Sequence, residues 1–387
     1  MPRITVYIPA YNHEPFVGAA IRSVLEQTYT DWELIVVDDA STDGTLREIR
    51  KFQDPRMRVI EFTGNQGAAS AANLCITKAA GDFVCPLSSD DVFLPDKLAR
   101  QVSYLKAHPD VLAVTAAPEF IDEGGRPLTG MHNYSGIFTS ENRTREQWLK
   151  HFFFHGCNLA HTSFMVRRSA YDQVGMYEHL LRQSPDLDLF VRLVLLGEIH
   201  VMEGPQGCFR VRDQDQNLSA PKPSTIGNMQ LELSWSLRRY LHPFVLNNLA
   251  GVFGEEWGQH RSEAEARLTL AEIAWSVRNP AHRTFAAHVL FDTSMLGLDA
   301  AAVEDFRRRA RSMLVEHDVY RFMEAEEWAQ KKRRLQEQKV RLQQKLDGAR
   351  AKLDGARAEN DAFKQSLSWK VTKPLRALQR LLRKPKA

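Results

Sequence analysis

The stretch that decides the fold runs from Leu34 to Thr45 and reads Leu-Ile-Val-Val-Asp-Asp-Ala-Ser-Thr-Asp-Gly-Thr. Its apolar run ends abruptly at two carboxylates, Asp38 and Asp39, and the residues after them favour a turn. This pattern is typical of a buried parallel strand whose carboxyl end opens into a crevice. Open α/β sheets bind ligands in that crevice. In the alternative interpretation, the two carboxylates only form the turn and cap the next helix.

Strand and helix patterns alternate through the first third of the chain. The predicted strands are Ile4–Pro9, Leu34–Asp38, Arg58–Phe62 and Phe83–Leu87, with helices over 17–25, 46–52 and 67–80 and from Pro95 onward. Repeated βα units predict an α/β fold with a doubly wound, mostly parallel sheet. One edge of that sheet would gather the segments Pro9–Asn12, Asp38–Asp39, Asn65–Gly67 and Asp90–Asp91. The second acidic pair weighs against a purely structural role for the first.

Length and composition limit the classes of protein that this chain can represent. At 387 residues it exceeds the ~250–300 at which one hydrophobic core stops growing, so a main domain with additions is expected. The formal net charge of +3 gives no indication of nucleic-acid binding. The four cysteines show no CxxC spacing, which indicates a reducing compartment. Because no cleavable signal and no run of ~18 apolar residues is evident, we expect a cytoplasmic protein without a membrane span.

The acidic edge has suitable chemistry for a nucleoside diphosphate held by a metal ion. Asp90 and Asp91 are adjacent hard oxygen ligands without a nearby His or Cys, which suits Mg²⁺ or Mn²⁺. Such an ion would neutralise the charge that develops on a leaving diphosphate. Kinases and nucleotidyltransferases also need acids near phosphates, so they remain alternatives. A P-loop is excluded, because the segment Gly64–Gly67 lacks the required Lys.

Five blocks of sequence resemble the family 2 glycosyltransferases. They are Tyr7-Ile8-Pro9-Ala10-Tyr11-Asn12, Ser23-Val24-Leu25-Glu26-Gln27-Thr28, Val36-Val37-Asp38-Asp39-Ala40-Ser41-Thr42-Asp43-Gly44-Thr45, Asn65-Gln66-Gly67 and Leu87-Ser88-Ser89-Asp90-Asp91. The resemblance implies a GT-A fold, an inverting mechanism, a nucleoside-diphosphate sugar as donor and a divalent metal, Mn²⁺ or Mg²⁺. It covers about 90 residues, and the five blocks occur in the order that the family shows.

The resemblance also implies roles for individual residues. The implied donor-binding residues are Pro9, Ala10, Tyr11, Asp38, Asp39, Asn65, Gly67 and Asp90, and the implied metal ligands are Asp90 and Asp91. Two positions depart from the family pattern. Ser88 replaces the first carboxylate of the acidic motif, which shifts metal coordination toward Asp91, and Ala72 stands where an Arg is common. The second departure leaves the donor nucleotide open.

The second block, residues 111–219, would supply the acceptor side. Val111–Thr115 is predicted as a strand, His161–Val166 as another, and 184–196 as a helix with Asp186 and Asp188 in its first turn. Family members carry an acidic motif here, so Asp186 resembles the general base that takes the proton of the acceptor hydroxyl. Asp188 would be a supporting residue, while Pro185 replaces a Glu of the motif. In the alternative interpretation, these carboxylates only cap the helix.

A further loop of this block contains two arginines. The segment Phe209-Arg210-Val211-Arg212 resembles an aromatic-Arg-x-His loop of the family, with Arg212 in place of His. Arg210 or Arg212 would clamp the diphosphate of the donor. The alternative for each is a surface ion pair. His155 and His161 would line the acceptor groove without taking part in the chemistry.

The last part of the chain has a different character. After Pro221-Lys222-Pro223 the pattern predicts only helices, including one over 302–314, and heptads over 328–365 predict a coiled coil that would join two or more copies. The tail, 366–387, has seven Lys or Arg and no acid from Lys370 onward. Its basic amphipathic pattern with an adjacent Trp suits an anionic membrane surface, and its sequence resembles the endings of bacterial surface-polysaccharide glycosyltransferases.

Together these features predict a GT-A glycosyltransferase domain over 1–220, with a nucleotide-binding half over 1–110 and an acceptor half over 111–220. A helical domain over 224–327, the coiled coil and the tail would follow. The expected function is metal-dependent, inverting transfer of a sugar from a nucleoside diphosphate to a hydroxyl of a growing bacterial surface glycan. The protein would work in the cytoplasm, at the inner face of the cell membrane, where a lipid-linked acceptor would lie. The alternatives are a nucleotidyltransferase that uses the same acidic edge, and a non-catalytic scaffold with a degenerate domain.

Overall fold

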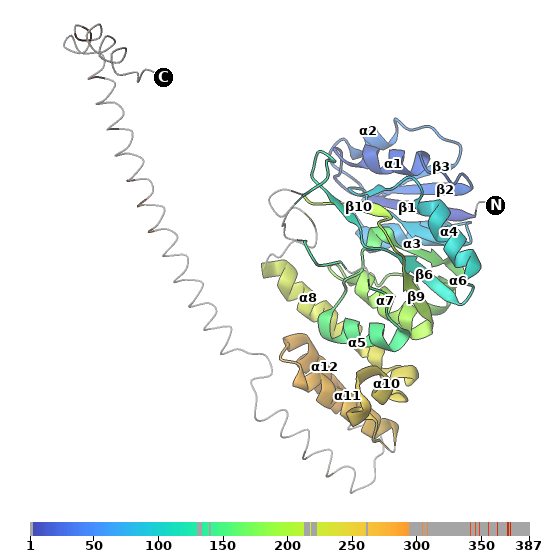
Figure 1. Ribbon diagram of the computed structural model, residues 1–387, viewed down its shortest axis with the longest axis vertical. Coiled ribbons are helices and arrows are strands. Elements are labelled where there is room, and N and C mark those ends of the chain that lie inside the picture. The colour runs from blue at the N-terminus through green and yellow to red at the C-terminus, as the bar shows by residue number, and fades with distance from the viewer. Residues whose placement is uncertain are drawn as a thin grey trace, which may run out of the picture. The chain divides into compact units, whose positions relative to one another are not determined.

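A computed structural model describes residues 3–129, 134–138, 141–212, 217, 223–260 and 262–293, together with isolated positions further along the chain. The chain divides into two compact units, Met1–Val319 and Tyr320–Ala387, and every element discussed below belongs to the first (Figure 1). The predicted helix over 302–314, the coiled coil over 328–365 and the basic tail lie outside the described residues, apart from isolated positions.

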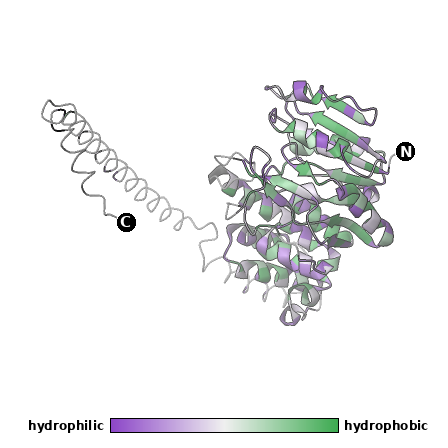
Figure 2. Ribbon diagram, turned by 45° about the horizontal axis from the view of Figure 1, so that its top comes forward, coloured by the Kyte–Doolittle hydropathy of each residue, from purple (hydrophilic) through white to green (hydrophobic). Residues whose placement is uncertain are grey.

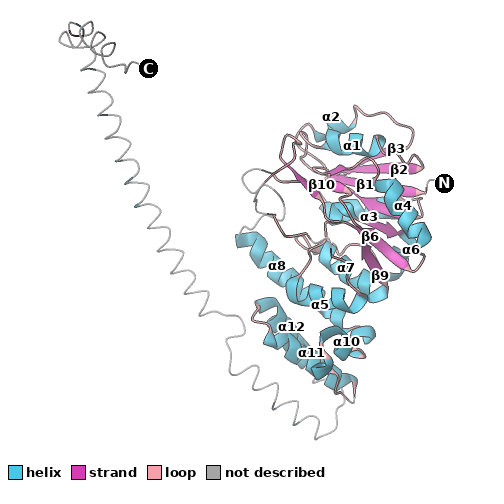
Figure 3. Ribbon diagram, in the orientation of Figure 1, coloured by secondary structure: helices cyan, strands magenta, loops and turns pink. Residues whose placement is uncertain are grey.

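The first unit is built around a seven-stranded sheet with the strand order β3-β2-β1-β4-β8-β6-β9 (Figure 3). Its strands are β1 (Ile4–Ala10), β2 (Trp32–Asp38), β3 (Met57–Glu61), β4 (Phe83–Pro86), β6 (Val111–Thr115), β8 (Met165–Arg167) and β9 (Glu198–Val201). Strand β8 runs antiparallel to both of its neighbours, and the other pairs are parallel. The predicted α/β class with a mostly parallel sheet is confirmed.

Helices cover both faces of this sheet, as the alternation of side chains along β2 requires. Leu34 and Val36 pack in one apolar cluster with α1 (Val17–Leu25) and α4 (Lys97–Ala107), whereas Ile35 and Val37 pack in the other. The second cluster includes α3 (Ala68–Lys78), α5 (Arg145–His155), α6 (Arg168–Val174) and α7 (Pro185–Leu196). Figure 2 shows that the strands between these layers are largely hydrophobic. The short helix α2 (Thr45–Ile49) contacts α1.

A small second sheet joins the two predicted halves of the domain. Its order is β5-β10-β7, with β5 (Val92–Phe93), β10 (Gly207–Arg210) and β7 (Glu119–Ile121). Strand β10 is antiparallel to β5 and parallel to β7. Since β5 directly follows the acidic pair Asp90–Asp91, this sheet brings the Arg210 segment to the donor edge.

One predicted element of the acceptor half was wrong in its detail. The strand predicted over His161–Val166 is a 3₁₀ turn, η1 (His161–Ser163), followed by the short strand β8. The turn places residues 161–163 against β4 and β10. The apolar run was too short for its periodicity to distinguish a strand from a turn that enters one.

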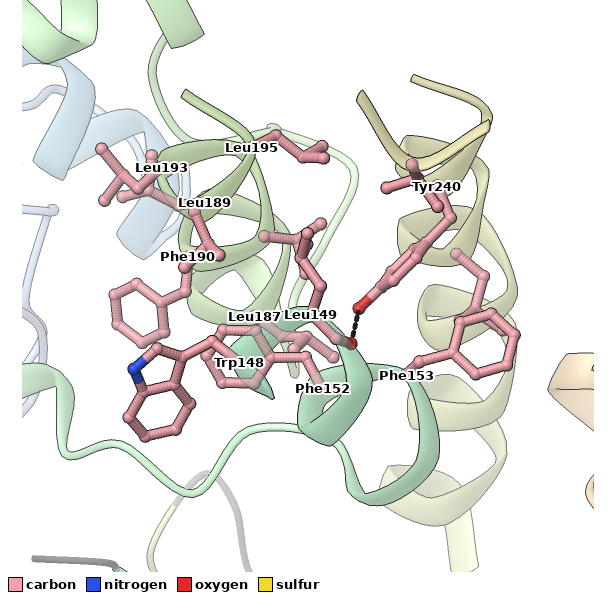
Figure 4. Close-up of a cluster of buried hydrophobic side chains, with 14 of the residues drawn as sticks. Trp148, Leu149, Phe152, Phe153, Leu187, Leu189, Phe190, Leu193, Leu195 and Tyr240 are labelled. Atoms are coloured by element: carbon pink, nitrogen blue, oxygen red, sulfur yellow. Dashed lines mark hydrogen bonds between the residues drawn. The ribbon is translucent and has the colours of Figure 1, made fainter. Parts of the chain in front are cut away.

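The segment after residue 222 is helical, as predicted, and packs directly on the sheet domain. It contains α8 (Pro223–Ser236), η3 (Leu237–Leu241), α9 (Pro243–Leu246), α10 (Leu249–Phe253), η4 (Glu255–Trp257), α11 (Glu263–Ser276) and α12 (Pro280–Thr293). Tyr240 lies among side chains of α5 and α7, and its hydroxyl donates to the Leu149 carbonyl at 2.7 Å (Figure 4). This segment therefore shares its apolar core with the helices that carry the acceptor half. Within the described part of the chain, no helix has the length and apolar character needed to cross a membrane.

Candidate functional site

The carboxyl ends of β1 and β2 are tied together by short polar contacts. Ala10 lies opposite Asp38 in the ladder, and the two loops that follow contain Asn12 and Ala40 with φ of 51° and 57°. The Asn12 side chain accepts the backbone N–H of Thr42 at 2.8 Å. Left-handed conformations of non-glycine residues are uncommon and concentrate at functional sites. These loops are therefore held in a specific, sterically demanding conformation.

Asp39 fixes the loop that follows β3. Its carboxylate is 2% exposed and accepts the backbone N–H groups of Gln66 at 2.6 Å and of Gly67 at 2.8 Å. Gly67 has φ of +89°, a conformation that glycine adopts without strain, and begins the approach to α3. Asn65 is exposed in the same loop. Asp39 thus joins two of the predicted donor-binding segments.

Asp38 presents an acceptor that the protein itself does not satisfy. Its Oδ2 atom accepts the Ser41 N–H at 3.1 Å, but its Oδ1 atom is buried and has no hydrogen-bond partner among the described residues. A buried carboxylate oxygen without a donor is costly, so such an atom is suited to accept a hydrogen bond from a ligand. Pro9 is half-buried, Ala10 is buried and the Tyr11 ring is 43% exposed at the same strand end. A base or a ribose would supply the N–H or O–H that Oδ1 needs.

The acidic turn after β4 points its two carboxylates in different directions. The half-buried Ser88 accepts the Asp91 N–H through its carbonyl at 3.0 Å, and this bond closes the turn. The Asp91 side chain is 3% exposed and accepts the Arg210 N–H at 2.8 Å. Burial, and then the charge of Asp90, raises the pKa of Asp91 well above its usual range. Asp91 therefore contacts β10, whereas Asp90 lies on the side of His13.

His13, for which the sequence predicted no role in the site, lies among the polar groups of this edge. Its Nε2 atom is 3.1 Å from the Arg212 guanidinium and 4.0 Å from the Asp90 carboxylate, and its Nδ1 atom is 2.7 Å from the Ser89 hydroxyl. Because a guanidinium can only donate, Nε2 is the acceptor and Nδ1 carries the proton. Burial lowers the pKa of His13 below its usual value. The negative charge of Asp90 opposes this shift in part, and the positive charge of Arg212 adds to it. The sequence feature that could have identified His13 is its position in the loop that follows the first strand.

The two arginines of the predicted clamp have different environments. Arg210 is 3% exposed, and its guanidinium donates to the carbonyls of Asp90 at 2.6 Å, Asp122 at 2.8 Å and Glu123 at 3.0 Å. This arginine therefore supports the acidic turn from within the protein. Arg212 contacts His13 and is half-buried, so the clamp hypothesis is better placed on Arg212.

The donor set fits a hard divalent cation that is held mainly by the substrate. Among the residues that the structure describes, no three or more His, Cys, Asp or Glu side chains cluster so as to hold a metal ion. Mg²⁺ and Mn²⁺ need only one or two protein carboxylates when substrate phosphates complete the coordination. The partly exposed Asp90 carboxylate suits this role, whereas Asp91 is already engaged by the Arg210 backbone.

The predicted base lies in the first turn of α7. The Asp186 side chain is half-buried, and its Oδ1 atom accepts the Leu187 N–H at 2.9 Å. Burial raises the pKa of Asp186 to about 6, and the negative charge of Glu232 on α8 contributes. Cys157 and Tyr177 lie close enough for the Asp186 charge to raise their pKa values too. A carboxylate with this pKa remains ionised at neutral pH and is a stronger base than an exposed one.

A buried hydrogen-bond chain connects the base side to β1. The Tyr177 hydroxyl lies 3.1 Å from the Tyr7 hydroxyl and 2.7 Å from His161 Nε2. Burial lowers the pKa of His161 to about 4, so this ring is neutral at pH 7. The backbone of Tyr177 is held by Asn73 on α3, which accepts its N–H and donates to its carbonyl, each at 2.9 Å. Tyr177 therefore couples the donor half and the acceptor half.

Asp188 has a structural environment. Its side chain is fully buried and accepts Nε–H of Arg192, one turn later, and Nε–H of Arg239 in η3, each at 2.8 Å. Because both guanidinium groups are hydrogen-bonded to it, Asp188 anchors α7 and supports the neighbouring Asp186.

The chain is similar in sequence to known proteins. Residues 5–175 match the family model Glycosyl transferase family 2. The chain is 31% identical over 198 residues to the putative teichuronic acid biosynthesis glycosyltransferase TuaG of Bacillus subtilis (strain 168), covering 51% of this chain and 73% of TuaG. It is 39% identical over 102 residues to UDP-Glc:alpha-D-GlcNAc-diphosphoundecaprenol beta-1,3-glucosyltransferase WfgD of Escherichia coli, covering 26% of this chain and 40% of WfgD. A crystal structure of S. aureus TarS 1–349 in complex with UDP-GlcNAc has a TM-score of 0.49 and 16% identity, covering 80% of this chain and 91% of that one.

Proposed function

This chain belongs to glycosyl transferase family 2, and from that membership we propose that it transfers a sugar, with inversion, from a nucleoside diphosphate to a hydroxyl of a bacterial surface glycan. TuaG is named as a putative glycosyltransferase of teichuronic acid biosynthesis, and WfgD is named as a glucosyltransferase with UDP-Glc as donor and a diphosphoundecaprenol-linked GlcNAc as acceptor. A lipid-linked acceptor is accordingly part of the proposal. The chain would work in the cytoplasm at the inner face of the membrane, to which the basic tail would attach it.

The observation that carries this proposal is the Asp186 carboxylate. It is half-buried in the first turn of α7 and has a pKa of about 6, so it is both ionised at neutral pH and basic enough to accept a proton. In the proposed step, Asp186 takes the proton of the acceptor hydroxyl while the oxygen of that hydroxyl attacks C1 of the donor sugar. The bond from C1 to the phosphate oxygen breaks on the opposite face, and the nucleoside diphosphate leaves.

The other side chains of the site would bind and orient the donor. The unsatisfied Oδ1 of Asp38 would accept a hydrogen bond from the base or ribose, and Asp39 would hold the loop of Asn65 and Gly67 around it. Arg212 would donate to the diphosphate. A divalent cation bound by Asp90 and the phosphates would stabilise the charge of the leaving group.

The test is to incubate the full-length chain with a panel of UDP-, GDP- and TDP-sugars, with Mn²⁺ or Mg²⁺, and to measure release of the nucleoside diphosphate. We expect one donor class to be consumed in the presence of an acceptor, and the D186N variant to lose this activity. The anomeric configuration of the product, measured by NMR, would be inverted relative to the donor. Release of pyrophosphate from a nucleoside triphosphate would instead indicate a nucleotidyltransferase, and binding of no nucleotide sugar in calorimetry would indicate a scaffold.

A further inference from the structure

We propose that Glu232, on helix α8 outside the sheet domain, is a positioning residue that holds the turn carrying Asp186 in its productive place. The inference rests on the proposed role of Asp186 as the base. It extends the catalytic machinery to a helical segment in which no chemical motif is evident. The contacts of Glu232 with the residues that precede α7 provide the structural argument.

The Glu232 side chain is engaged by four donors from one short segment. Its Oε1 atom accepts the Arg182 N–H at 2.9 Å, and its Oε2 atom accepts the N–H groups of Gln183 and Ser184, each at 2.8 Å. The Ser184 hydroxyl donates to Oε2 as well, at 3.1 Å. Glu232 is 6% exposed and Ser184 is 8% exposed, so these bonds form away from bulk water. Charge-assisted bonds of this kind are about twice as strong as neutral ones.

The position of these contacts matters because they lie at the N-terminus of α7. The first N–H groups of a helix have no partner within the helix, and a carboxylate near that end is favoured by the helix dipole. Ser184 is the residue before α7, and Asp186 is the second residue within it. Glu232 therefore holds the backbone two residues before the proposed base.

A second contact holds α7 just after the base. Asp188 is bonded to Arg239 of η3, which directly follows α8 in the chain. Asp186 thus lies between Ser184 and Asp188, and both of these residues are held by the same helical segment. Figure 1 shows α8 beside α7, and contacts between α7 and both α8 and η3 agree with this view. The segment determines the orientation of the turn that presents Asp186.

This arrangement distinguishes positioning from general stabilisation. If Glu232 positions the base, its loss would change the geometry of proton transfer more than the binding of the donor, whose contacts lie at the sheet edge. A displacement of about 1 Å at a reacting group can reduce the rate about 10²-fold. If Glu232 only stabilised the fold, its loss would lower the melting temperature and leave kcat of the folded protein unchanged.

The test compares E232Q with E263Q in the full-length chain. Glu263 is an exposed residue of α11 that pairs with Arg267, so E263Q controls for the loss of one carboxylate. For E232Q we expect kcat to fall by about 10- to 100-fold, KM for the donor to stay within about twofold, and amide hydrogen exchange at residues 182–184 to accelerate. E232D, which keeps the charge, is expected to recover part of kcat. E263Q is expected to match the unmodified chain.

Several results would overturn the inference. One is that E232Q folds and its kcat is unchanged. Another is that amide hydrogen exchange at residues 182–184 is unchanged in E232Q, and a third is that its donor KM rises as much as its kcat falls. If E232Q does not fold, S184A removes one of the four contacts and is expected to give the same change in kcat, smaller in size; an unchanged kcat in S184A would then count against the proposal. Normal kcat in D186N would overturn the proposed function itself, whereas loss in D186N with no effect in E232Q would overturn only the positioning role.

Discussion

The donor edge of the sheet and the turn that carries Asp186 are assembled in different ways. At the donor edge, Asp39 bonds to N–H groups 27 and 28 residues later, across neighbouring βα units. Around Asp186, the contacts span 48 residues from Ser184 to Glu232 and 51 residues from Asp188 to Arg239. The Tyr7–Tyr177 contact spans 170 residues. The part of the donor edge around Asp39 thus depends on a repeated local pattern. The base depends on packing between distant segments, as do the contacts that bring Arg210 and Arg212 to the same edge.

This difference implies that the two regions respond differently to substitution. Changes at the donor edge should alter donor binding and one loop. Changes around α7 should alter proton transfer or the stability of the whole unit, because α7 shares its apolar cluster with α5 and the helices after residue 222. The following experiments test this distinction.

The largest effect is expected for D186N. The amide cannot accept the proton of the acceptor hydroxyl, so kcat should fall by about 10²- to 10⁴-fold, while KM for the donor should stay unchanged. Steady-state kinetics with the donor identified by the screen would measure both values. A D186N protein that retains its kcat would place the base elsewhere.

A large effect on stability is expected for D188N. Asp188 is fully buried between Arg192 and Arg239, and removing one member of a buried ion pair leaves uncompensated charge. The free energy of unfolding should fall by about 3 kcal/mol, which urea denaturation would measure. A change below 1 kcal/mol would show that α7 is not anchored by these contacts.

At the donor edge, D39N should have a smaller effect on stability and a selective effect on donor binding. The new amide would turn an NH₂ group toward the N–H of Gln66 or Gly67 and leave a buried donor unpaired. The free energy of unfolding should fall by about 1–3 kcal/mol, and KM for the donor should rise more than kcat falls. The exposed Asp172 provides a matched control in D172N. An unchanged donor KM in D39N would show that the loop held by Asp39 does not contribute to donor binding.

The pH dependence of the reaction should report Asp186. Its pKa of about 6 means that kcat/KM should fall about tenfold per pH unit below that value, as the carboxylate becomes protonated. The facing groups are Glu232, whose charge raises this pKa, and Tyr177 and Cys157, whose own pKa values are raised by burial. A pH profile of kcat/KM measures the acid limb. A limb near pH 4 would contradict the buried environment of Asp186.

The same pKa predicts the sign of its effect on stability. The pKa of Asp186 is higher in the folded state than the usual value of about 3.9 in an unfolded chain. The folded state therefore binds this proton more tightly, so the contribution of Asp186 to stability is present below about pH 4 and is lost as the pH rises through about 6. If activity is lost as the pH falls from about 6 to about 4, protonation of Asp186 would therefore not cause that loss by unfolding the protein.

The smallest effect is expected at an exposed ion pair on the surface of the sheet domain. Arg50 and Glu61 are 2.7 Å apart, but their side chains are 62% and 43% exposed. E61Q should change the free energy of unfolding by less than about 1 kcal/mol, because water screens the pair. Urea denaturation beside D188N would measure the contrast. A large effect of E61Q would mean that burial does not determine which of these ion pairs contributes more to the free energy of unfolding.

The sequence allowed much of the donor half to be predicted. The apolar runs of β1, β2 and β4 are buried and end at the polar groups that form the edge, and α1, α3 and α4 form where their periodicities indicated helices. The weaker points were short elements. Strand β8 has only three residues, Met165–Arg167, and β5 has two, Val92–Phe93, so neither contains enough residues for a period to emerge.

The sequence alone determined the alternation of strands and helices, the acidic groups at the strand ends and the acid-bearing start of α7, because periodicity and turn chemistry act over a few residues. Only the tertiary structure decided that Arg210 supports the acidic turn from inside, that His13 lies against Arg212 and Asp90, and that Glu232 bonds to the segment before α7. These contacts join residues far apart in the chain, and packing of the two apolar clusters sets which of them meet.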